Sequence, residues 1–382
     1  MIYLDHAAAT PVSDKVLKAM KPFMTDDFFN PSSAYLPAAR VRGMYEDAKN
    51  KIANFIGAKG NDLVITSGAT EANMLACTAV SKTGKILVLE TEHASVLENV
   101  KKYKYSTVKA DKTGLINLTD LKAKLTDDVE LVSVSLANNE LGTIQPLAEI
   151  SQILKEVRLS RLKKGITTQL LLHSDASQGL ALIELNVARL GVDLMTLNAA
   201  KVCGPKGVGA LYVGHGVRLN PVSMGGGQER GLRAGTENIA GVVGFATAID
   251  AVKGHSTAAR KKYTTLVKSL KSELEKAKVE PIFLGTPKHQ LANFLPVSFP
   301  GLDAERLIFM LEEKEVYVST GAACSASKGE PSHVLRAIGL SSKEIAGSLR
   351  ISLGVLNNES NVKEAGKIIR EVVDKEYARL YD

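Results

Sequence analysis

The feature of this sequence that most constrains its fold is a series of short apolar runs separated by longer amphipathic stretches. The runs lie at residues 62–66, 85–90, 130–135, 169–173, 193–197 and 208–213. Continuous apolar runs are typical of strands buried on both faces, and the amphipathic stretches between them are typical of covering helices. We therefore predict an α/β fold in which a mostly parallel, mixed sheet lies between layers of helices.

The pattern changes after an Ala-, Val- and Gly-rich helix predicted over residues 238–252. Beyond it we expect a charged helix at 258–278, strands at 281–284 and 295–299, and helices at 304–314 and 361–380. This change indicates two domains. We expect a large domain of residues 15–255 and a smaller α+β domain formed by residues 1–14 together with 256–382.

The chain carries 48 Lys and Arg against 41 Asp and Glu, a formal net charge of +7. Clustered basic residues would attract the phosphates of a nucleic acid. The densest basic runs, at 101–104 and 158–164, are single short stretches, and aromatic residues make up 5% of the chain, few for a base-stacking surface. These features favour a solvated basic surface over direct nucleic-acid binding.

The three cysteines, Cys77, Cys203 and Cys324, are widely spaced. Their spacing matches neither a disulfide framework nor a zinc-ligand pattern, so we expect no metal. The first residues lack a signal-peptide pattern, and no apolar run approaches the roughly 20 residues that span a bilayer. We therefore expect a cytoplasmic protein that does not enter a membrane.

Polar and small residues follow several of the predicted strands, at the edge of an α/β sheet where ligands bind. Ser67-Gly68-Ala69-Thr70 follows the first run and leads into a helix. Such a turn can grip a phosphate, although the same residues also make an ordinary helix cap. His93 and Asn139 follow the next two runs.

An aspartate and a lysine follow two further runs. Asp175 lies where a carboxylate needs a partner, either a cationic ring nitrogen or the N–H groups of the next helix. Lys201 precedes a Gly-Pro turn, where desolvation suits an amine that forms a Schiff base. Together they are the arrangement that pyridoxal 5'-phosphate (PLP) chemistry needs, because the carboxylate keeps the pyridine nitrogen protonated while the lysine carries the aldehyde carbon.

Two loops complete the set of candidate functional segments. Residues 225–238 are glycine-rich and include two arginines, which indicates backbone that approaches an anion. Residues 319–327 form a small-residue loop around Cys324. A structural cysteine normally lies within an apolar pattern, so this position favours a reactive thiol.

Taken in order, these motifs resemble those of cysteine desulfurases of the NifS/IscS-like class, in the class V aminotransferase branch of fold-type I PLP-dependent enzymes. The matching segments include Tyr3-Leu4-Asp5-His6-Ala7-Ala8, Gly-Ala-Thr-Glu-Ala-Asn at 68–73, Asn-Asn-Glu-Leu-Gly at 138–142 and Arg350-Ile351-Ser352-Leu353-Gly354. They extend over nearly the whole chain. The resemblance implies a homodimer that binds PLP and acts on L-cysteine.

The resemblance also implies roles for individual residues at the cofactor. Lys201 matches the Schiff-base lysine, Asp175 the partner of the pyridine nitrogen, and His93 the ring-stacking histidine that assists proton transfer. The other implied cofactor contacts are Ala69, Thr70, Asn139, Gln178, Asn198 and, from the second subunit, Thr236.

For the substrate, the resemblance implies contacts from Asn30, Asn139 and Arg350, of which Arg350 pairs with the carboxylate. Cys324 matches the nucleophile that accepts sulfur. The implied reaction converts L-cysteine to L-alanine and leaves a persulfide on Cys324. That sulfur would pass to an acceptor protein, either an iron–sulfur scaffold or a tRNA-thiolation enzyme.

The sequence departs from the family pattern beside the lysine. The family usually has a histidine at the position of Ala200 and a serine at that of Asn198, and both help to hold the phosphate. We therefore expect weaker retention of PLP. The family also commonly has histidine at the position of Tyr35, which affects the substrate entrance.

Two other functions remain open at this point. One is a selenocysteine lyase or another class V aminotransferase-like PLP enzyme, which would use much of the same machinery. The other is a degenerate, non-catalytic homologue that acts as a sulfur-transfer scaffold, which Ala200 favours.

Overall fold

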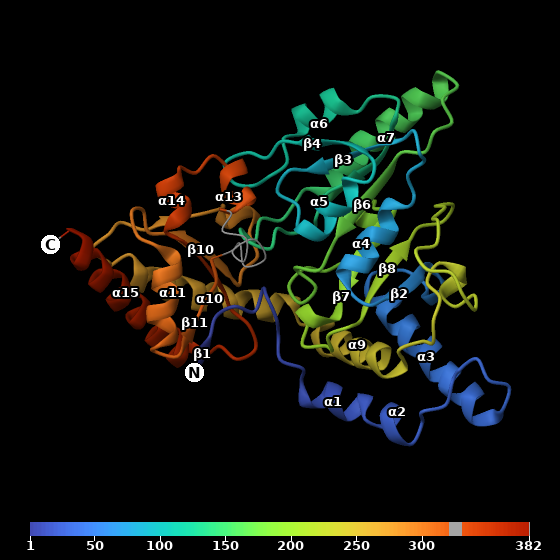
Figure 1. Ribbon diagram of the computed structural model, residues 1–382, viewed down its shortest axis with the longest axis horizontal. Helices are drawn as coiled ribbons and strands as arrows, with labels where there is room; N and C mark the ends of the chain where they lie inside the picture. The colour runs from blue at the N-terminus through green and yellow to red at the C-terminus, as the bar shows by residue number, and fades with distance from the viewer. Residues whose placement is uncertain (321–330, 382) are drawn as a thin grey trace.

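The computed structural model describes residues 1–320 and 331–381 of the chain (Figure 1). Its main element is a seven-stranded sheet in the order β2-β8-β7-β6-β5-β3-β4. The strands are β2 (Leu63–Thr66), β3 (Lys85–Leu89), β4 (Lys104–Val108), β5 (Val129–Ser133), β6 (Leu171–Asp175), β7 (Leu194–Asn198) and β8 (Gly209–Val213). β8 runs antiparallel to both of its neighbours and the remaining pairs are parallel, which confirms the predicted mixed, mostly parallel sheet.

Helices cover both faces of this sheet, because alternate side chains of each strand point to opposite sides. In β3, Leu87 belongs to a hydrophobic cluster that includes residues of α3 (Leu36–Phe55), α7 (Leu147–Lys163) and α9 (Ile239–Val252). Its neighbour Val88 belongs to a different cluster, which includes residues of α4 (Ala69–Cys77) and α5 (Ala94–Val100). Burial on both faces explains why most of these strands are continuous apolar runs.

One strand of the sheet, β4, was not predicted. The basic stretch at 101–104 is mostly exposed, as expected, and its last residue begins a strand, Lys104–Val108, that pairs in parallel with β3 at the edge of the sheet. Only the last residue of β4 is buried. An edge strand with solvated faces carries no apolar run, so the pattern that identified the other strands is absent here.

A further hydrophobic cluster lies beside the seven-stranded sheet and its helices (Figure 1). It is formed by the long helices α10 (Ser256–Leu274), α11 (Ala304–Glu312) and α15 (Glu359–Tyr381), with β9 (Ile282–Phe283), β10 (Phe294–Ser298) and β12 (Ser348–Ser352) in an antiparallel sheet. The N-terminal strand β1 (Ile2–Tyr3) pairs with β11 (Val316–Tyr317), and Ile2 and Leu4 belong to this cluster. The first residues of the chain are therefore packed with its last third.

Shorter elements connect these parts. They are α1 (Asp14–Met20), α2 (Pro22–Thr25), α6 (Leu118–Lys124), α8 (Val187–Leu190), α13 (His333–Ala337), α14 (Ser342–Ala346), and the 3-10 turns η1 (Gly60–Asp62), η2 (Ala199–Lys201), η3 (Glu229–Gly231) and η4 (Pro287–His289). Among the described residues, none of the helices is both long and apolar enough to cross a bilayer.

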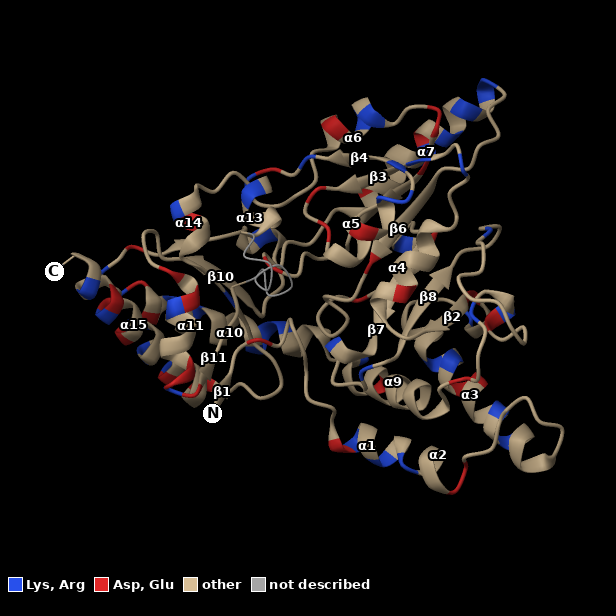
Figure 2. Cartoon of the chain, in the orientation of Figure 1, with Lys and Arg blue, Asp and Glu red and all other residues tan. Residues whose placement is uncertain are grey.

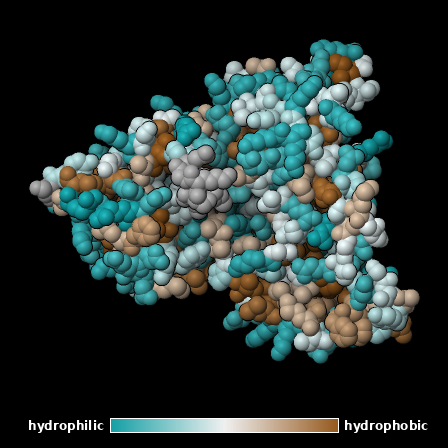
Figure 3. All heavy atoms as spheres, viewed as in Figure 1, coloured by the Kyte–Doolittle hydropathy of each residue, from teal (hydrophilic) through white to brown (hydrophobic). Residues whose placement is uncertain are grey.

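The surface carries mixed charge, and the face shown in Figure 3 includes an apolar region. Lys and Arg are interspersed with Asp and Glu over the helices of both parts (Figure 2). Apolar side chains gather around α1, α2 and the start of α3, at the lower right of the view (Figure 3). The exposed large apolar residues there are Leu17, Met24, Phe28, Tyr35 and Leu36.

Candidate active site

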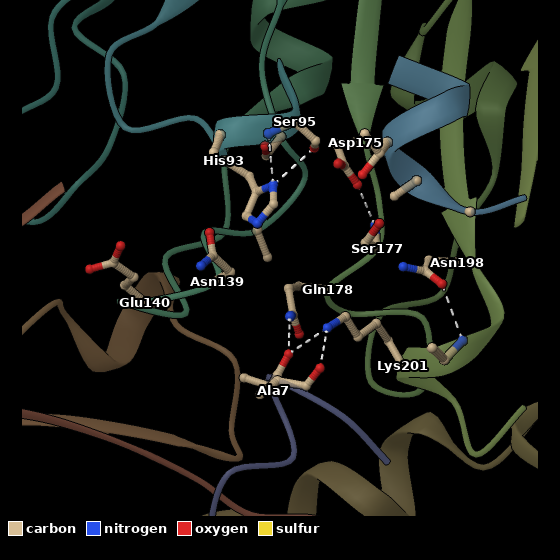
Figure 4. A pocket seen from close by; sticks show the side chains of 18 of the residues that line it. Ala7, His93, Ser95, Asn139, Glu140, Asp175, Ser177, Gln178, Asn198 and Lys201 are labelled. Carbon is tan, nitrogen blue, oxygen red and sulfur yellow. Dashed lines mark hydrogen bonds between the residues drawn. The ribbon is translucent and has the colours of Figure 1, made fainter. Parts of the chain in front are cut away.

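A cavity of about 620 Å³ lies at the carboxyl ends of the central strands, where the sequence predicted ligand binding (Figure 4). Most of the predicted site residues line it. These are Ala69, Thr70, His93, Asn139, Asp175, Gln178, Asn198, Lys201 and Arg350. The fold therefore brings together residues that are up to 281 positions apart, from Ala69 to Arg350.

Two of the predicted site residues in the described part of the chain are not among those that line the cavity. Asn30 and Thr236 are exposed and lie elsewhere on the chain. Asn30, expected at the substrate, is thus not brought to the cavity by the fold of a single chain, while Thr236 was expected to act on a second subunit. Cys324 lies outside the described residues.

The N-terminus of α4 forms one end of the cavity. The turn into this helix passes through Gly68 at φ 151° and ψ −174°, a conformation that is essentially restricted to glycine. The first N–H groups of a helix have no intrahelical acceptor, and here they lie with the Thr70 hydroxyl at the cavity wall. This arrangement suits a phosphate group.

Glu71 ties this turn to the glycine-rich segment. Its Oε2 accepts a hydrogen bond from the Ser67 N–H at 2.6 Å, and its Oε1 accepts one from Arg233 Nε at 3.0 Å. Burial by itself would raise the pKa of Glu71, but these hydrogen bonds and the Arg233 charge hold it below its ordinary value. The carboxylate is therefore ionised and holds the turn in shape.

Asn198 and Ala200 flank the same end of the cavity. Asn198 Oδ1 accepts a hydrogen bond from the Ala200 N–H at 3.2 Å and caps the turn η2. Ala200 offers no polar side-chain atom. The side chain of Ala200 therefore cannot donate a hydrogen bond to a phosphate.

Asp175 ends β6 and is buried in the wall of the cavity. Its Oδ2 accepts a hydrogen bond from Asn73 Nδ2 at 2.8 Å, and its Oδ1 accepts one from the Ser177 N–H at 2.8 Å. A carboxylate has about four acceptor positions, so capacity remains for a donor in the cavity. With an anion cradle at α4, this carboxylate and a lysine in one cavity, the residues fit PLP.

Lys201 follows β7 on the turn η2 and contacts the N-terminal segment. Its Nζ donates hydrogen bonds to the carbonyl oxygens of Ala7 at 2.9 Å and Ala8 at 2.6 Å (Figure 4). Gln178 Nε2 also donates to Ala7 O, at 3.0 Å. Sequence reasoning did not find Ala7 and Ala8, because they act through backbone carbonyls and carry no side-chain signal.

His93 caps the N-terminus of α5 through its ring. Its Nδ1 accepts a hydrogen bond from the Ser95 N–H at 3.0 Å, so the proton of the neutral ring is on Nε2. The second ring nitrogen faces the cavity (Figure 4). Burial lowers the pKa of His93 below its ordinary value, against the opposing charge of Asp175, which keeps the ring neutral near pH 7.

Arg350 lies on β12 and already has partners in the cavity wall. Its Nη2 donates to Asp5 Oδ1 at 2.7 Å, and its Nη1 donates to Asn139 O at 3.1 Å. Among the described residues, its buried Nε has no hydrogen-bond partner. Burial raises the pKa of Asp5, although the Arg350 charge opposes this shift.

Two buried glutamates near the site were also missed. Glu92 is fully buried, and burial raises its pKa to about 8, while its carboxylate accepts hydrogen bonds from Ser135 N and Ser135 Oγ. Glu140 accepts a hydrogen bond from Ser332 Oγ at 2.6 Å, which fastens the N-cap of α13 to the cavity wall. Glu140 lies within the Asn-Asn-Glu-Leu-Gly segment, but Ser332 is 192 positions away, so no local pattern in the sequence indicates this contact.

Cation-binding groups do not gather in the described part of the chain. Within residues 1–320 and 331–381, no group of three or more His, Cys, Asp or Glu side chains is placed to hold a metal ion.

Comparison with known proteins places the chain in one family along its length. The family model described as aminotransferase class-V matches residues 2–364. The chain is 37% identical to "Cysteine desulfurase IscS 1" of Archaeoglobus fulgidus, over 98% of this chain and 97% of that protein. It is also 37% identical to "Cysteine desulfurase IscS" of Dictyoglomus turgidum, over 98% of this chain and 95% of that protein.

Solved structures show the same similarity in three dimensions. A protein described as "NIFS-LIKE PROTEIN" aligns with a TM-score of 0.89 and 33% identity, covering 98% of this chain and 99% of that one. "SspA in complex with cysteine" aligns with a TM-score of 0.79 and 30% identity, covering 92% and 99%. Together with the sheet and the cavity described above, these matches show that the chain belongs to the aminotransferase class-V family and has the fold of its NifS-like members.

Proposed function

We propose that this protein is a PLP-dependent cysteine desulfurase, which converts L-cysteine to L-alanine and transfers the sulfur to its own Cys324. The observation that carries the proposal is one cavity that combines Lys201, Asp175 and Arg350 with the N-terminus of α4. The names of the most similar relatives support the same activity.

Different residues of the cavity would hold different parts of the cofactor. The phosphate would lie at the start of α4, against the N–H groups near Ala69 and the Thr70 hydroxyl, with Asn198 nearby. Asp175 would accept a hydrogen bond from the pyridine nitrogen, and Lys201 would carry the aldehyde carbon. When bound, PLP supplies an electron sink that makes the substrate α-carbon acidic and the β-carbon–sulfur bond cleavable.

The chain's own residues bind the substrate and move protons. The Arg350 guanidinium would bind the substrate carboxylate, for which a planar cation with several donors is suited. Lys201 Nζ, in the same cavity, would take the α-proton of the substrate. The neutral His93 ring would donate a hydrogen bond from Nε2. The Ser95 N–H, which donates to the other ring nitrogen, fixes the orientation of the ring.

The sulfur transfer needs no additional oxidant or reductant. The Cys324 thiolate attacks the substrate sulfur, a new sulfur–sulfur bond forms, and the bond between that sulfur and the substrate β-carbon breaks. The electron pair of the broken bond and a proton complete the methyl group of alanine, and Cys324 becomes a persulfide. The thiolate is the reactive form, so a reducing cytoplasm suits the reaction.

We further propose a homodimer, with domains of residues 15–255 and of residues 1–14 plus 256–382. The apolar surface around α1, α2 and the start of α3 supports an interface there, since patches of this kind are characteristic of association sites. Exposed Thr236 would then reach the cofactor phosphate of the second subunit. The sulfur would leave Cys324 for an acceptor protein, an iron–sulfur scaffold or a tRNA-thiolation enzyme.

The test is the formation of alanine and sulfide from L-cysteine, with added PLP and a reducing thiol, beside the same assay with L-selenocysteine. We expect both products in equal amounts, and a visible absorbance band in the purified protein. The Lys201→Ala variant should lose both products and the band. Cys324→Ser should keep the band and lose sulfide release.

Full sulfide release by Cys324→Ser would contradict the assignment of the nucleophile. A colourless, inactive wild type would favour a non-catalytic scaffold.

A further inference from the structure

A fully buried amide connects two of the proposed cofactor residues. Asn73 lies on α4, is 0% exposed and does not line the cavity. Its Nδ2 donates one hydrogen bond to Asp175 Oδ2 at 2.8 Å and a second to Ser95 Oγ at 2.9 Å. The single NH₂ group of Asn73 thus contacts both the aspartate of β6 and the serine of α5.

The chemistry of these partners determines which atom donates at each contact. An ionised carboxylate accepts hydrogen bonds, so the Asn73 atom facing Asp175 is the NH₂ group and not the carbonyl. His93 Nδ1 already accepts from the Ser95 N–H, so at its 2.9 Å contact with Ser95 Oγ the hydroxyl donates. The Ser95 oxygen is then left to accept from Asn73. The direction of every hydrogen bond from Asp175 to His93 is therefore settled.

Burying the Asn73 amide carries a free-energy penalty, which indicates that the amide does more than fill space in the core. Its Oδ1 is buried and has no hydrogen-bond partner among the described residues. An unsatisfied buried carbonyl destabilises the fold, and a leucine of similar size would avoid this penalty. The two Nδ2 contacts are what a leucine could not supply.

We propose that Asn73 is a positioning residue, which uses its one NH₂ group to orient the Asp175 carboxylate and, through the Ser95 hydroxyl, to hold His93 as the tautomer protonated on Nε2. Asn73 acts from outside the cavity and touches neither substrate nor cofactor. The inference rests on the proposed function for the roles of Asp175 and His93, but the hydrogen-bonded chain itself does not depend on that function.

Removing Asn73 should change the protonation of His93 in a defined direction. Without Asn73, the Ser95 hydroxyl is free to turn and accept from a protonated Nδ1, so the charged ring becomes less unfavourable. The other charged groups that act on this ring are Asp175, which favours its protonation, and Lys201, His333 and Arg350, which oppose it. Asn73→Ala leaves the charges of these groups in place but removes a hydrogen bond from Asp175, whereas Ser95→Ala leaves that hydrogen bond intact. A change in His93 that both variants share therefore reports on the chain through Ser95.

The experiment compares wild-type holoenzyme with Asn73→Ala, Ser95→Ala and the double variant. Ring nitrogen NMR of protein labelled at histidine identifies the tautomer and the pH of half-protonation, and His93→Gln assigns the signal. Cys77→Ala is the matched control, because Cys77 is buried on the same helix and faces the apolar cluster. We expect Asn73→Ala to raise the half-protonation pH of His93 by about 0.5 to 1 unit and to mix its tautomers.

Steady-state kinetics with L-cysteine provide a second readout. We expect Asn73→Ala to lower kcat by about tenfold, a part of what a positioned acid or base contributes, with KM changed less than about twofold. The double variant should lose no more than the larger single effect, because both substitutions break one chain. Cys77→Ala should match the wild type in both readouts.

An unchanged His93 signal in Asn73→Ala would overturn the inference. If Asn73→Ala fails to fold, Ser95→Ala decides in its place, since it breaks the same link at Ser95 of α5 and leaves the hydrogen bond from Asn73 to Asp175 in place. An unchanged ring signal in Ser95→Ala would then overturn it. A wild type without desulfurase activity but with the expected NMR changes would contradict the proposed function alone.

Discussion

Arg350 Nη2 and Asp5 Oδ1 lie 2.7 Å apart, although the two residues are 345 positions apart in the chain. The Arg350 side chain is 5% exposed and that of Asp5 is 16% exposed. This contact joins the N-terminal segment to β12 beside the cavity, and it presents the guanidinium with one carboxylate already bound. The donors of Arg350 that remain are what a substrate carboxylate would use.

Replacing this arginine should mainly affect substrate binding. Arg350→Lys keeps the charge but loses the planar set of donors, so a lysine cannot hold Asp5, Asn139 and a substrate carboxylate together. We expect KM for L-cysteine to rise about tenfold or more with a smaller change in kcat, measured by alanine formation. Arg306→Lys is the control, since Arg306 pairs with Glu376 on the far helices. A KM equal to that of the wild type would show that Arg350 does not bind the carboxylate.

Introducing at position 200 the histidine that the sequence resemblance implies should strengthen cofactor binding. Ala200 lines the cavity beside Asn198, and a histidine there would add a donor for the phosphate. A hydrogen bond to a charged group contributes about 1.5–3 kcal/mol, so we expect Ala200→His to lower the PLP dissociation constant about tenfold or more. Dialysis followed by absorbance measures retention, and Ala200→Ser, with a shorter hydroxyl, gives the comparison. Equal retention by wild type and Ala200→His would refute the idea.

Two buried histidines should make folding sensitive to acid. Burial lowers the pKa of His6 to about 4, and it does the same for His173. The unfolded chain binds these protons near pH 6.5, so the stability is fully present above that pH and is lost as the pH falls toward 4. Each histidine accounts for up to about 3 kcal/mol of this loss.

Denaturant unfolding measured from pH 7 to pH 4 checks this prediction. We expect His6→Asn to lose less stability over that range than the wild type, whatever its stability at pH 7. His215→Asn is the control, because His215 is exposed. Identical pH slopes for wild type and His6→Asn would rule out His6 as a source of the acid sensitivity.

A buried ion pair should anchor the glycine-rich segment. Lys49 on α3 and Glu229 lie 3.0 Å apart with side chains 8% and 5% exposed, and Glu229 also accepts hydrogen bonds from Tyr45 Oη and the Ile65 N–H. Glu229 and Arg230 have φ of 47° and 61°, a left-handed conformation that such residues adopt only when held. We expect Lys49→Met to lower the free energy of unfolding by about 3–5 kcal/mol, because it leaves a buried charge unpaired.

Chemical denaturation of Lys49→Met, Glu229→Gln and the double variant tests this anchor. The double variant should lose less stability than the two single losses added together, since it leaves no unpaired charge. Lys51→Met, on an exposed lysine of the same helix, should change stability by less than about 1 kcal/mol. Additive losses would show that Lys49 and Glu229 act independently.

Much of the fold could be predicted because its strands are buried on both faces. The run that became β3 ends in four consecutive buried apolar residues, at 86–89, which leave no polar position at which a loop could be proposed instead. β4 escaped prediction because its faces are solvated at the sheet edge. The two-residue strands β1 and β11 escaped because their pairing joins segments more than 300 residues apart, and so short a run has no pattern.

The sequence by itself determined the class of fold and the polar residues at the ends of the buried strands, including Asp175 and Lys201. It did so because strand burial and catalytic chemistry both constrain the type of side chain. Only the tertiary structure decided how these residues are held. The carbonyls of Ala7 and Ala8, the amide of Asn73 and the carboxylate of Asp5 act through backbone atoms or distant partners. Such contacts depend on where the folded chain brings the atoms, which no local pattern of residues records.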